Sequence, residues 1–426
     1  MVTPRLCIVD GVSTGVRLAR ELHARGIACA HVASTPTYRH AATSPENHHL
    51  YTAQFALDRA DDFQQLAAAV RAWSPTFVIA GSESGVALAD SLCAALGITE
   101  ANDATTTAWR RNKYAMHDRL RRTGLAHARQ IRTADIGQAA QWLCDHNNYP
   151  VVVKPLDSAG SDGVQVCDNF DHALAAFASL RGVPHALGGL NEEVLIQEYL
   201  AGTLYAVNTI SWNGEHYVSD IWKDKRRPRP GGAFLFEGKV LQPSDGEIEQ
   251  ALSVYTCRVL DALGLRYGAG HSEVMWTSRG AVLVEVNARL NGACIEDATI
   301  VQALGYTQAQ LLADAYVRPK NFHERRQAGP YAAYKNLGEV AFLFSRDGQL
   351  TAFPGRERIA ALPSFCSFSA VPALGSHVKQ TIDTCGAPGF ASFLHPDRAV
   401  VEADVDAVIT WQRADELFTI AEENPA

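Results

Sequence analysis

Two glutamates, Glu273 and Glu285, lie on opposite sides of a predicted β-hairpin turn. The apolar runs 273–277 and 281–286 flank residues 278–280, which fit a three-residue loop closed by a left-handed glycine. Closing the hairpin there places the two glutamates directly opposite each other. Like charges in that position destabilise an antiparallel pair, and Mg²⁺ prefers oxygen ligands of this kind. The hairpin therefore indicates a site for divalent metal ions.

The two faces of this hairpin differ in polarity when its side chains alternate. One face is expected to carry the polar residues His271, Glu273, Glu285, Asn287 and Arg289, together with Met275, Ala281 and Leu283. The other face is expected to carry Val274, Trp276, Val282, Val284 and Val286. A solvent-facing hairpin whose glutamates are neutralised by Arg289 stays open as an alternative, as does a structural role for His271.

The predicted buried strand 151–154 is a second segment that could take part in chemistry, because it ends in a lysine, Lys154. A lysine ammonium at the end of such a strand is costly unless it meets an anion. The loop 155–163 that follows is rich in small residues, namely Ser158, Gly160, Ser161 and Gly163. Its backbone N–H groups can approach an anion closely, so Lys154 and this loop predict a phosphate cradle. An edge-strand lysine followed by an ordinary turn is the alternative.

Three other positions give weaker signals. Lys113 begins a predicted helix, where the helix dipole disfavours a cation unless an anion such as phosphate binds there; a solvated lysine is the commoner case. Glu83 heads the predicted helix 85–96, where it serves equally well as an ordinary complement to the dipole. The strand 194–198 runs into a hinge that could offer its backbone to the edge of an adenine, formed by Gln197, Glu198, Tyr199 and Leu200.

The segment 222–232 is basic and rich in proline and glycine. We expect it to interrupt the strand region as a loop, either a mobile one that brings cations to phosphate or carboxylate groups or a plain solvated one. The net charge of −8 and the lack of interleaved aromatic residues argue against a nucleic-acid patch.

The composition of the 426-residue chain is that of an ordinary globular protein, with 47% hydrophobic and 20% charged residues. Its net charge gives no reason to expect nucleic acid or an anionic membrane as a partner. The nine cysteines are scattered without a CxxC pair, which predicts neither a disulfide framework nor a zinc site and favours a reducing cytoplasm. The apolar run 6–9 ends at Asp10, so a secretory pattern is not indicated, and no apolar stretch approaches the length of a membrane span.

The first 112 residues alternate between predicted strands and helices, which is a parallel, doubly wound α/β pattern. Strands are expected over 6–9, 27–32 and 77–80, and helices over 16–24 and 85–96. A dinucleotide-binding domain is disfavoured, because residues 10–15 lack the GxGxxG spacing and no acidic residue closes the second strand.

Residues 113–200 form a predicted α+β insert that is small enough to move as a lid. Its helices are expected over 113–122, 134–147 and 169–181, and its strands over 151–154, 164–167 and 194–198. From residue 201 the chain is rich in strands, with helices near 245–263 and across 295–315. Residues 330–420 are expected to form further short strands with glycine and proline turns.

Taken in order, these residues resemble the ATP-grasp superfamily. Its motifs match Lys113, Lys154 with the Ser/Gly loop, the hinge 197–200, Glu273, and the run Glu285-Val-Asn287-Ala-Arg289. The segments AGSESGVALADSLCAALG, RRNKYAM and KPLDSAGSDGV are most similar to the L-amino acid α-ligases, the bacterial dipeptide synthetases. The resemblance covers about residues 5–300, and it is more specific for the superfamily than for these ligases.

The resemblance implies an α/β (α+β) fold of three domains. These are an N-terminal doubly wound α/β domain over 1–112, a central α+β lid over 113–200 and a C-terminal catalytic domain with a mixed sheet over 201–426. It also implies ATP between the last two domains, two Mg²⁺ ions that Mn²⁺ could replace, and amino acids as small-molecule substrates beside ATP. A homodimer stays open.

The same resemblance implies a role for each matching residue. The contacts to ATP would come from Lys113, Lys154, Ser158, Gly160, Ser161, Gln197, Glu198, Tyr199 and Leu200. The metal ligands would be Glu273, Glu285 and Asn287, and the amino acid site would be lined by His271, Glu83, Gly292 and Ala293. Arg289 would act in catalysis together with Lys154, by steadying the transferring phosphoryl group and later the tetrahedral oxyanion.

Two positions depart from the pattern of related ligases. Relatives often place an acidic ribose contact shortly after the hinge glycine, where this chain has Leu204, so the resemblance does not indicate how the ribose is held. Some relatives carry a bulky aromatic residue where this chain has Ala293, which implies a roomier acceptor pocket.

The implied activity is that of an ATP-dependent carboxylate–amine ligase, which joins two L-amino acids through an acylphosphate and releases ADP and phosphate. An ATP-grasp ligase that acts on a non-proteinogenic acid or amine in secondary metabolism is the nearest alternative. A biotin carboxylase-like role would need a carrier protein, and the chain has no carrier segment. A non-catalytic ATP-binding regulator is disfavoured by the intact Glu285, Asn287 and Arg289.

Overall fold

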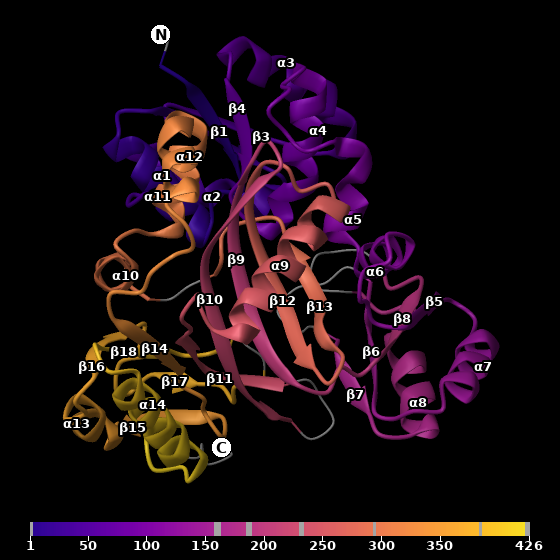
Figure 1. Ribbon diagram of the computed structural model, residues 1–426, viewed down its shortest axis with the longest axis vertical. Coiled ribbons are helices and arrows are strands. Elements are labelled where there is room, and N and C mark those ends of the chain that lie inside the picture. Colours follow the sequence, from indigo (N-terminus) through magenta and orange to yellow (C-terminus); the bar gives the residue numbers. More distant parts are fainter. Residues whose placement is uncertain are drawn as a thin grey trace.

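The computed structural model describes residues 3–156, 163–184, 190–229, 234–292, 295–382 and 386–421. Four of the predicted site residues lie outside these ranges, namely Ser158, Gly160, Ser161 and Ala293. The described chain is a mixed α/β fold built on four β-sheets (Figure 1). None of the helices it contains is both long and apolar enough to cross a bilayer.

The first sheet is parallel and has helices on both faces, as the doubly wound pattern predicts. Its strands, in the spatial order β3-β2-β1-β4, are β1 (Arg5–Val9), β2 (Ala28–Ala33), β3 (Ala53–Ala56) and β4 (Phe77–Ala80). Leu6 and Ile8 of β1 pack in one core with α1 (Thr14–Ala24), whereas Cys7 and Val9 pack in another with α3 (Phe63–Trp73) and α4 (Val86–Leu96). The short helix α2 (His40–Thr43) follows β2. Alternate residues of one strand thus supply both cores.

The second sheet is antiparallel and lies within the predicted lid. Its strands follow the order β5-β8-β6-β7 and are β5 (Gln130–Thr133), β6 (Val151–Pro155), β7 (Gln165–Cys167) and β8 (Val194–Glu198). The helices α7 (Ile136–His146) and α8 (Phe170–Leu180) share a core with it. The helices α5 (Thr107–Arg111) and α6 (Lys113–Arg122) connect this unit to the first sheet. The division of the chain at residues 112 and 200 stays a prediction.

An eight-stranded antiparallel sheet lies at the centre of the molecule (Figure 1). Its spatial order is β13-β12-β9-β10-β11-β14-β18-β16. These strands are β9 (Thr203–Trp212), β10 (Glu215–Pro228), β11 (Phe234–Leu241), β12 (Gly268–Thr277), β13 (Gly280–Asn287), β14 (Asn336–Ala341), β16 (Phe365–Ser369) and β18 (Phe390–His395). Helix α9 (Glu247–Ala262) packs on β12 and β13, and α11 (Gln308–Val317) packs between β9 and α1. In the sequence, α10 (Asp297–Leu304) precedes α11 and α12 (Pro319–Gln327) follows it.

Residues 330–420, which were predicted as short strands, also contain two helices, α13 (Gly355–Ala360) and α14 (Arg398–Arg413). They accompany a small sheet of order β17-β15-β19, made of β15 (Gly348–Ala352), β17 (His377–Val378) and β19 (Thr419–Ala421). The strand prediction was wrong for α14 because its buried apolar residues recur at helical spacing, as in Val401, Val405, Val408 and Ile409. Asp397 caps its first turn by accepting a hydrogen bond from Ala399 N at 2.9 Å.

The basic segment 222–232 is not a loop over its first part, because residues 222–228 belong to the long strand β10. Acidic neighbours make this density of positive charge tolerable in a strand. Arg226 lies 3.0 Å from Asp224, and Lys225 lies 2.6 Å from Asp406 of α14. Asp406, the partner on α14, comes from a distant part of the chain, so local sequence pattern could not predict this ion pair.

The hairpin of β12 and β13 opposes Glu273 to Glu285, as the sequence predicts. It closes differently, however: Thr277 pairs with Gly280, so the turn has two residues rather than three. A β-bulge at Val284 then adds one residue to β13 and restores the predicted pairing. The prediction was right for the pair of glutamates and wrong for the turn.

The bulge also changes the predicted faces of the hairpin, because it shifts the alternation of side chains by one residue. Two residues that were predicted beside the glutamates pack in the core with Val274 instead, namely Ala281 and Leu283. Val282 and Val284, which were predicted on the core face, pack with Leu200 of the hinge. Beyond the bulge, Val286 returns to the core, as predicted.

His117 of α6 holds the bulge in place. Its Nδ1 accepts a hydrogen bond from Ala128 N at 3.1 Å, so Nε2 carries the proton and donates to Val284 O at 3.1 Å. Burial lowers the pKa of His117 to about 3, and the ring is therefore neutral at physiological pH. Sequence reasoning missed His117, since a single histidine inside a helix carries no signal of its own.

Arg110 of α5 ties the first sheet to the central sheet. Its side chain is fully buried and pairs with Asp90 of α4 at 2.8 Å. The same guanidinium donates to the carbonyls of Leu263 and Gly264, each at 3.1 Å, in the turn that leads from α9 to β12. The hydrogen bonds of one side chain thus connect a helix that packs on the first sheet with a turn that leads into the central sheet.

We expect Arg110→Ala to lower the free energy of unfolding by about 3–5 kcal/mol, because it leaves the buried carboxylate of Asp90 without its counter-charge. Arg121→Ala is the matched control, since Arg121 is 60% exposed and pairs with Asp118 at the surface. Arg121→Ala should lower the free energy of unfolding by at most about 1 kcal/mol. Urea denaturation followed by tryptophan fluorescence measures both losses, and equal losses would contradict the anchoring role.

His117→Ala should lower the free energy of unfolding by about 2–4 kcal/mol, because two buried backbone groups lose their partners. His117→Gln keeps one donor and one acceptor and should lose less. The pKa of His117 is depressed in the folded chain, so its contribution is present above pH 6.5 and is lost as the pH falls toward 3. Wild-type stability should therefore fall more steeply over this range than that of His117→Gln; identical pH slopes would contradict the assignment.

Candidate active site

The lid sheet and the hairpin bring several predicted site residues together. Lys113 is the first residue of α6, and its Nζ lies 3.2 Å from Glu285 Oε2. Lys154, near the end of β6, is almost fully buried and donates to Gln197 Oε1 at 2.8 Å. Gln197 in turn donates to Gln130 Oε1 at 3.1 Å. Lys113 of the predicted lid thus pairs directly with Glu285 of the central sheet, and the charge of Lys154 acts on the same carboxylate.

Burial and charge together set the protonation of this cluster. Burial alone would raise the pKa of Glu285, but Lys113 and Lys154 outweigh it and lower the pKa to about 2. Burial, followed by the like charge of Lys113, lowers the pKa of Lys154 to about 8. At neutral pH Glu285 is therefore a carboxylate and Lys154 an ammonium whose proton is held less firmly than usual.

Glu273, opposite Glu285, has a cation of its own. Arg226 of β10 places its Nη2 3.4 Å from Glu273 Oε2 while it also pairs with Asp224. Burial raises the pKa of Glu273, Arg226 opposes that rise, and the facing charge of Glu285 adds to it. The repulsion between the two glutamates is therefore offset by Lys113 on one side and by Arg226 on the other.

Arg289 lies just past the hairpin and is held by two contacts. Its Nη1 donates to Leu290 O at 2.8 Å, and its Nε lies 3.7 Å from Glu83 Oε2. Glu83 also pairs with Arg111. Burial raises the pKa of Glu83, and the two arginines oppose that rise. Glu83 is thus more than a complement to a helix dipole, because it orients Arg289 beside the hairpin.

His271 and Asn287 form the next pair along the hairpin. Asn287 Nδ2 donates to Glu285 Oε1 at 3.2 Å. His271 Nδ1 lies 2.8 Å from Asn208 Oδ1 and therefore carries the proton, while its Nε2 lies 4.0 Å from Glu273 Oε1. Burial lowers the pKa of His271 well below its ordinary value, so the ring is neutral.

The hinge residues contact the hairpin and a neighbouring strand. Glu198 Oε1 accepts a hydrogen bond at 2.7 Å from Arg279 in the hairpin turn. The ring of Tyr199 stacks at 6.2 Å on that of Phe234, and Leu200 is buried. Leu204 is buried as well. Binding of adenine by Gln197, Glu198, Tyr199 and Leu200 stays a prediction.

Glu273, Glu285 and Asn287 are the side chains here that could hold metal ions. Facing carboxylates beside an amide oxygen are a donor set that suits Mg²⁺. The described residues contain no cluster of three or more His, Cys, Asp or Glu suited to a metal. An ion at this place would therefore need further oxygen ligands from phosphate and water, which is how Mg²⁺ is commonly held with nucleotides. Gly292 is exposed at the end of the segment that follows Arg289.

Sequence reasoning missed Asn208 and His117, and it placed Arg226 only within a basic loop that could bring cations to phosphate or carboxylate groups. For Arg226 a signal was present, because Trp222, Asp224 and Arg226 stand at the spacing of two that is typical of one strand face. Asn208 lies inside an apolar strand, where a lone amide has no obvious partner. These side chains acquire a role only when distant strands pair.

Comparisons with known proteins agree with this geometry. Residues 147–297, which include most of the lid and the hairpin, match the family model described as an ATP-grasp domain. The chain is also 31% identical over 408 residues to dapdiamide A synthase from Enterobacter agglomerans, and the match covers 94% of each chain.

Two solved structures share the fold over nearly the whole chain. The L-amino acid ligase from Bacillus licheniformis aligns with a TM-score of 0.74 and 17% identity, covering 100% of both chains. The biotin carboxylase domain of 2-oxoglutarate carboxylase from Hydrogenobacter thermophilus, solved with MgADP and bicarbonate, aligns with a TM-score of 0.62 and 12% identity, covering 99% of this chain and 91% of that one. Together with the full-length match to the synthase, these findings show that the chain belongs to the ATP-grasp family of ligases.

Proposed function

We propose that this ATP-grasp protein is a carboxylate–amine ligase that joins two L-amino acids into a dipeptide. The observation that carries the proposal is the convergence of Lys113 and Lys154 from the lid on Glu285 of the hairpin. A carboxylate and a triphosphate repel each other, so bringing them together is largely a matter of neutralising charge. The segments that resemble L-amino acid α-ligases support the choice of substrates.

The reaction requires activation, because a carboxylate does not react with an amine at neutral pH. A carboxylate oxygen of the first substrate attacks the γ-phosphorus of ATP, and the bond from that phosphorus to the bridging oxygen breaks, which yields ADP and an acylphosphate. A neutral amine of the second substrate then attacks the acyl carbon and loses a proton. The bond from that carbon to the phosphate oxygen breaks, and the products are an amide and inorganic phosphate.

In this scheme the charged side chains bind and align the anions. Lys113 and Lys154 bind the phosphates, and the loop with Ser158, Gly160 and Ser161 covers them. Arg289 faces the transferring phosphoryl group and later the oxyanion, in an orientation that its contact with Glu83 supports. A closed lid excludes water that would hydrolyse the acylphosphate. Adenine would lie against the hinge. A cytoplasmic location and a homodimer remain predictions from the sequence.

Metal ions belong to the same proposal. Glu273, Glu285 and Asn287 would hold two Mg²⁺ ions, or Mn²⁺ in their place, which neutralise charge on the terminal phosphates. The ion pairs that Lys113 and Arg226 make with the two glutamates support this assignment, since they show that both carboxylates attract cations.

A second candidate function is favoured by the match to dapdiamide A synthase at 31% identity over 94% of the chain. In this version the ligase acts on a non-proteinogenic acid or amine in secondary metabolism. The chemistry and the catalytic residues are the same, and only the substrate pocket differs. Screening proteinogenic and non-proteinogenic acid–amine pairs for ATP-dependent phosphate release separates the two candidates.

Glu285→Ala should abolish amide formation, and the closer mimic Glu285→Gln should lower kcat by at least about 100-fold, because the charge that organises metal and phosphate is lost. Glu247→Gln, at an exposed position of α9, is the matched control and should keep full activity. Phosphate release and product formation are measured together with the melting temperature. Full turnover by either Glu285 variant would remove the assignment.

The affinity for ATP should fall as the pH rises through about 8. The low pKa of Lys154 in the nucleotide-free protein means that a growing fraction of it is neutral above that pH, whereas bound phosphate favours its charged form. The loss should approach tenfold per pH unit, and binding near pH 8 should take up protons, which calorimetry in buffers of different ionisation enthalpy detects. Lys154→Arg stays charged and should lose this dependence; an unchanged profile in that variant would contradict the role of Lys154.

A further inference from the structure

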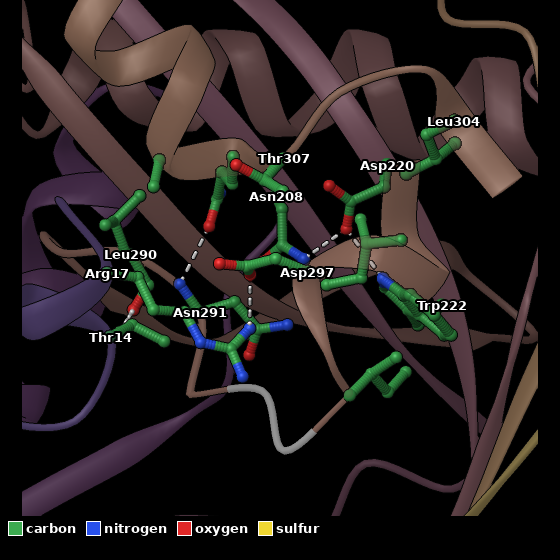
Figure 2. Close-up of a pocket in the computed structure, with 14 residues that line it drawn as sticks. Thr14, Arg17, Asn208, Asp220, Trp222, Leu290, Asn291, Asp297, Leu304 and Thr307 are labelled. Carbon is green, nitrogen blue, oxygen red and sulfur yellow. Dashed lines mark hydrogen bonds and ion pairs between the residues drawn. The ribbon is translucent and has the colours of Figure 1, made fainter. Parts of the chain in front are cut away.

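A pocket lies beside the proposed reaction centre, against the strands β9 and β10 of the central sheet (Figure 2). Side chains from α1, α10 and α11 enclose it, together with the segment that follows Arg289. One part of its lining is aliphatic and consists of Leu290, Ile295, Ile300 and Leu304. Another part is polar and includes Asn208, Asp220, Thr307 and Gln308. This lining adjoins the amino acid site that the resemblance implies at His271 and Gly292, but the roles proposed above assign no function to the residues of the lining themselves.

A row of hydrogen bonds connects the pocket to the reaction centre. His271, Asn208 and Asp220 stand side by side on β12, β9 and β10. Asn208 accepts a hydrogen bond from His271 Nδ1 at 2.8 Å and donates one to Asp220 Oδ1 at 2.5 Å. The pocket is therefore an extension of the surface that carries Glu273, and a substrate could reach from one to the other.

Asp220 differs from the glutamates of the reaction centre in having no cation beside it. It is only 6% exposed, and three neutral groups donate to it, namely Asn208 Nδ2, Trp222 Nε1 and Ser219 Oγ. Within the described ranges no ion pair reaches Asp220, whereas Glu273 and Glu285 each lie within 4 Å of a cationic side chain. A buried carboxylate without a counter-ion is costly, which points to a cation supplied by a ligand.

The backbone is shaped to turn Asp220 toward the pocket. A β-bulge at Ser219 adds one residue to β10, so that Val218 pairs with Thr209 and Asp220 with Asn208. The hydroxyl of Tyr306 donates to Ser219 O at 2.7 Å and so holds the bulge. Without the extra residue, Asp220 would lie on the other face of the sheet.

Gln308 offers a second group that the chain itself does not use. Its Oε1 accepts a hydrogen bond from Asn291 N at 2.9 Å. Its Nε2 is enclosed and, over the part of the chain that the structure describes, has no hydrogen-bond partner. A buried donor without a partner indicates an acceptor that arrives with a ligand, such as a carboxyl or carbonyl oxygen.

We propose that this pocket binds the amino acid whose carboxylate is activated, with its ammonium group on Asp220 and its side chain against the aliphatic wall. The proposal rests on the ligase function proposed above and names the acid substrate as a free α-amino acid. The amine that attacks must be neutral, and a buried carboxylate would hold it in the charged, unreactive form. Asp220 therefore suits the amino group that does not react, which is that of the acid substrate.

The test compares α-amino acids with 2-hydroxy acids that carry the same side chain. Hydroxylamine serves as a common amine that traps the acylphosphate, and ATP-dependent phosphate and hydroxamate are measured for L-alanine, L-leucine and L-glutamine and their hydroxy analogues. The proteins are the wild type, Asp220→Asn and the control Asp261→Asn, which removes an exposed carboxylate of α9. The amide introduced by Asp220→Asn can keep all three neutral contacts, since the hydroxyl of Ser219 can accept as well as donate.

The wild type should favour the amino acids, and Asp220→Asn should raise their KM by roughly 10- to 100-fold while changing the KM for the hydroxy acids little. The control should behave as wild type. The proposal would be overturned if Asp220→Asn preferred amino acids over hydroxy acids as strongly as the wild type does, or if the wild type showed no such preference. Asp220 would then be only a structural support for Trp222.

A wild type that releases no phosphate with any acid would count against the ligase function itself. In that case calorimetric binding of the same acids, with MgADP present, judges the pocket separately. Binding of an amino acid that its hydroxy analogue does not match, and that Asp220→Asn loses, would support the pocket. No binding, or equal binding by wild type and variant, would overturn it.

Discussion

The opposition of two partly buried carboxylates, Glu273 and Glu285, is the constraint on which the rest of the site depends. Two unit charges about 4 Å apart repel by roughly 4 kcal/mol at an effective dielectric constant near 20. That is a large part of the net stability of a domain, so the fold must supply positive charge on both sides. Lys113 does so from the start of α6 and Arg226 from near the end of β10. The lid and the central sheet are therefore joined electrostatically where nucleotide is proposed to bind.

Two β-bulges give the central sheet its chemical character. A regular antiparallel sheet would alternate its side chains without interruption, and each extra residue turns the following side chain to the opposite face. The bulge at Val284 precedes Glu285, and the bulge at Ser219 precedes Asp220. Each is held by a side chain from a helix or loop outside the sheet, through a hydrogen bond to the carbonyl of the inserted residue. In both places the bulge interrupts regular pairing and turns a carboxylate, Glu285 or Asp220, toward the proposed binding face of the sheet.

The sequence predicted those parts of the fold and site that depend on local pattern. A short apolar run located the strand that ends at Ala80, Gly124 marked the end of the helix that begins at Lys113, and the hairpin pattern opposed the two glutamates. That last prediction succeeded although its turn was wrong, because the bulge compensated for an error of one residue. What could not be predicted depends on partners far away in sequence. The carbonyl that His117 binds lies 167 residues along the chain, and the charges that keep Arg226 in a strand come from neighbouring residues and from β12.

Arg110 has a consequence for how the molecule can move. Because its guanidinium bonds at once to α4 and to the turn after α9, the first sheet and the central sheet are fastened into a single block. A second clamp, from Arg25 of the segment after α1 to Asp314 of α11, acts in parallel at 2.6 Å. The smaller unit of β5 to β8 has a core of its own outside this block, so the lid motion predicted for it would not require the first and central sheets to move relative to each other. The amino acid pocket, whose walls belong to that block, would keep its shape whether the lid is raised or lowered.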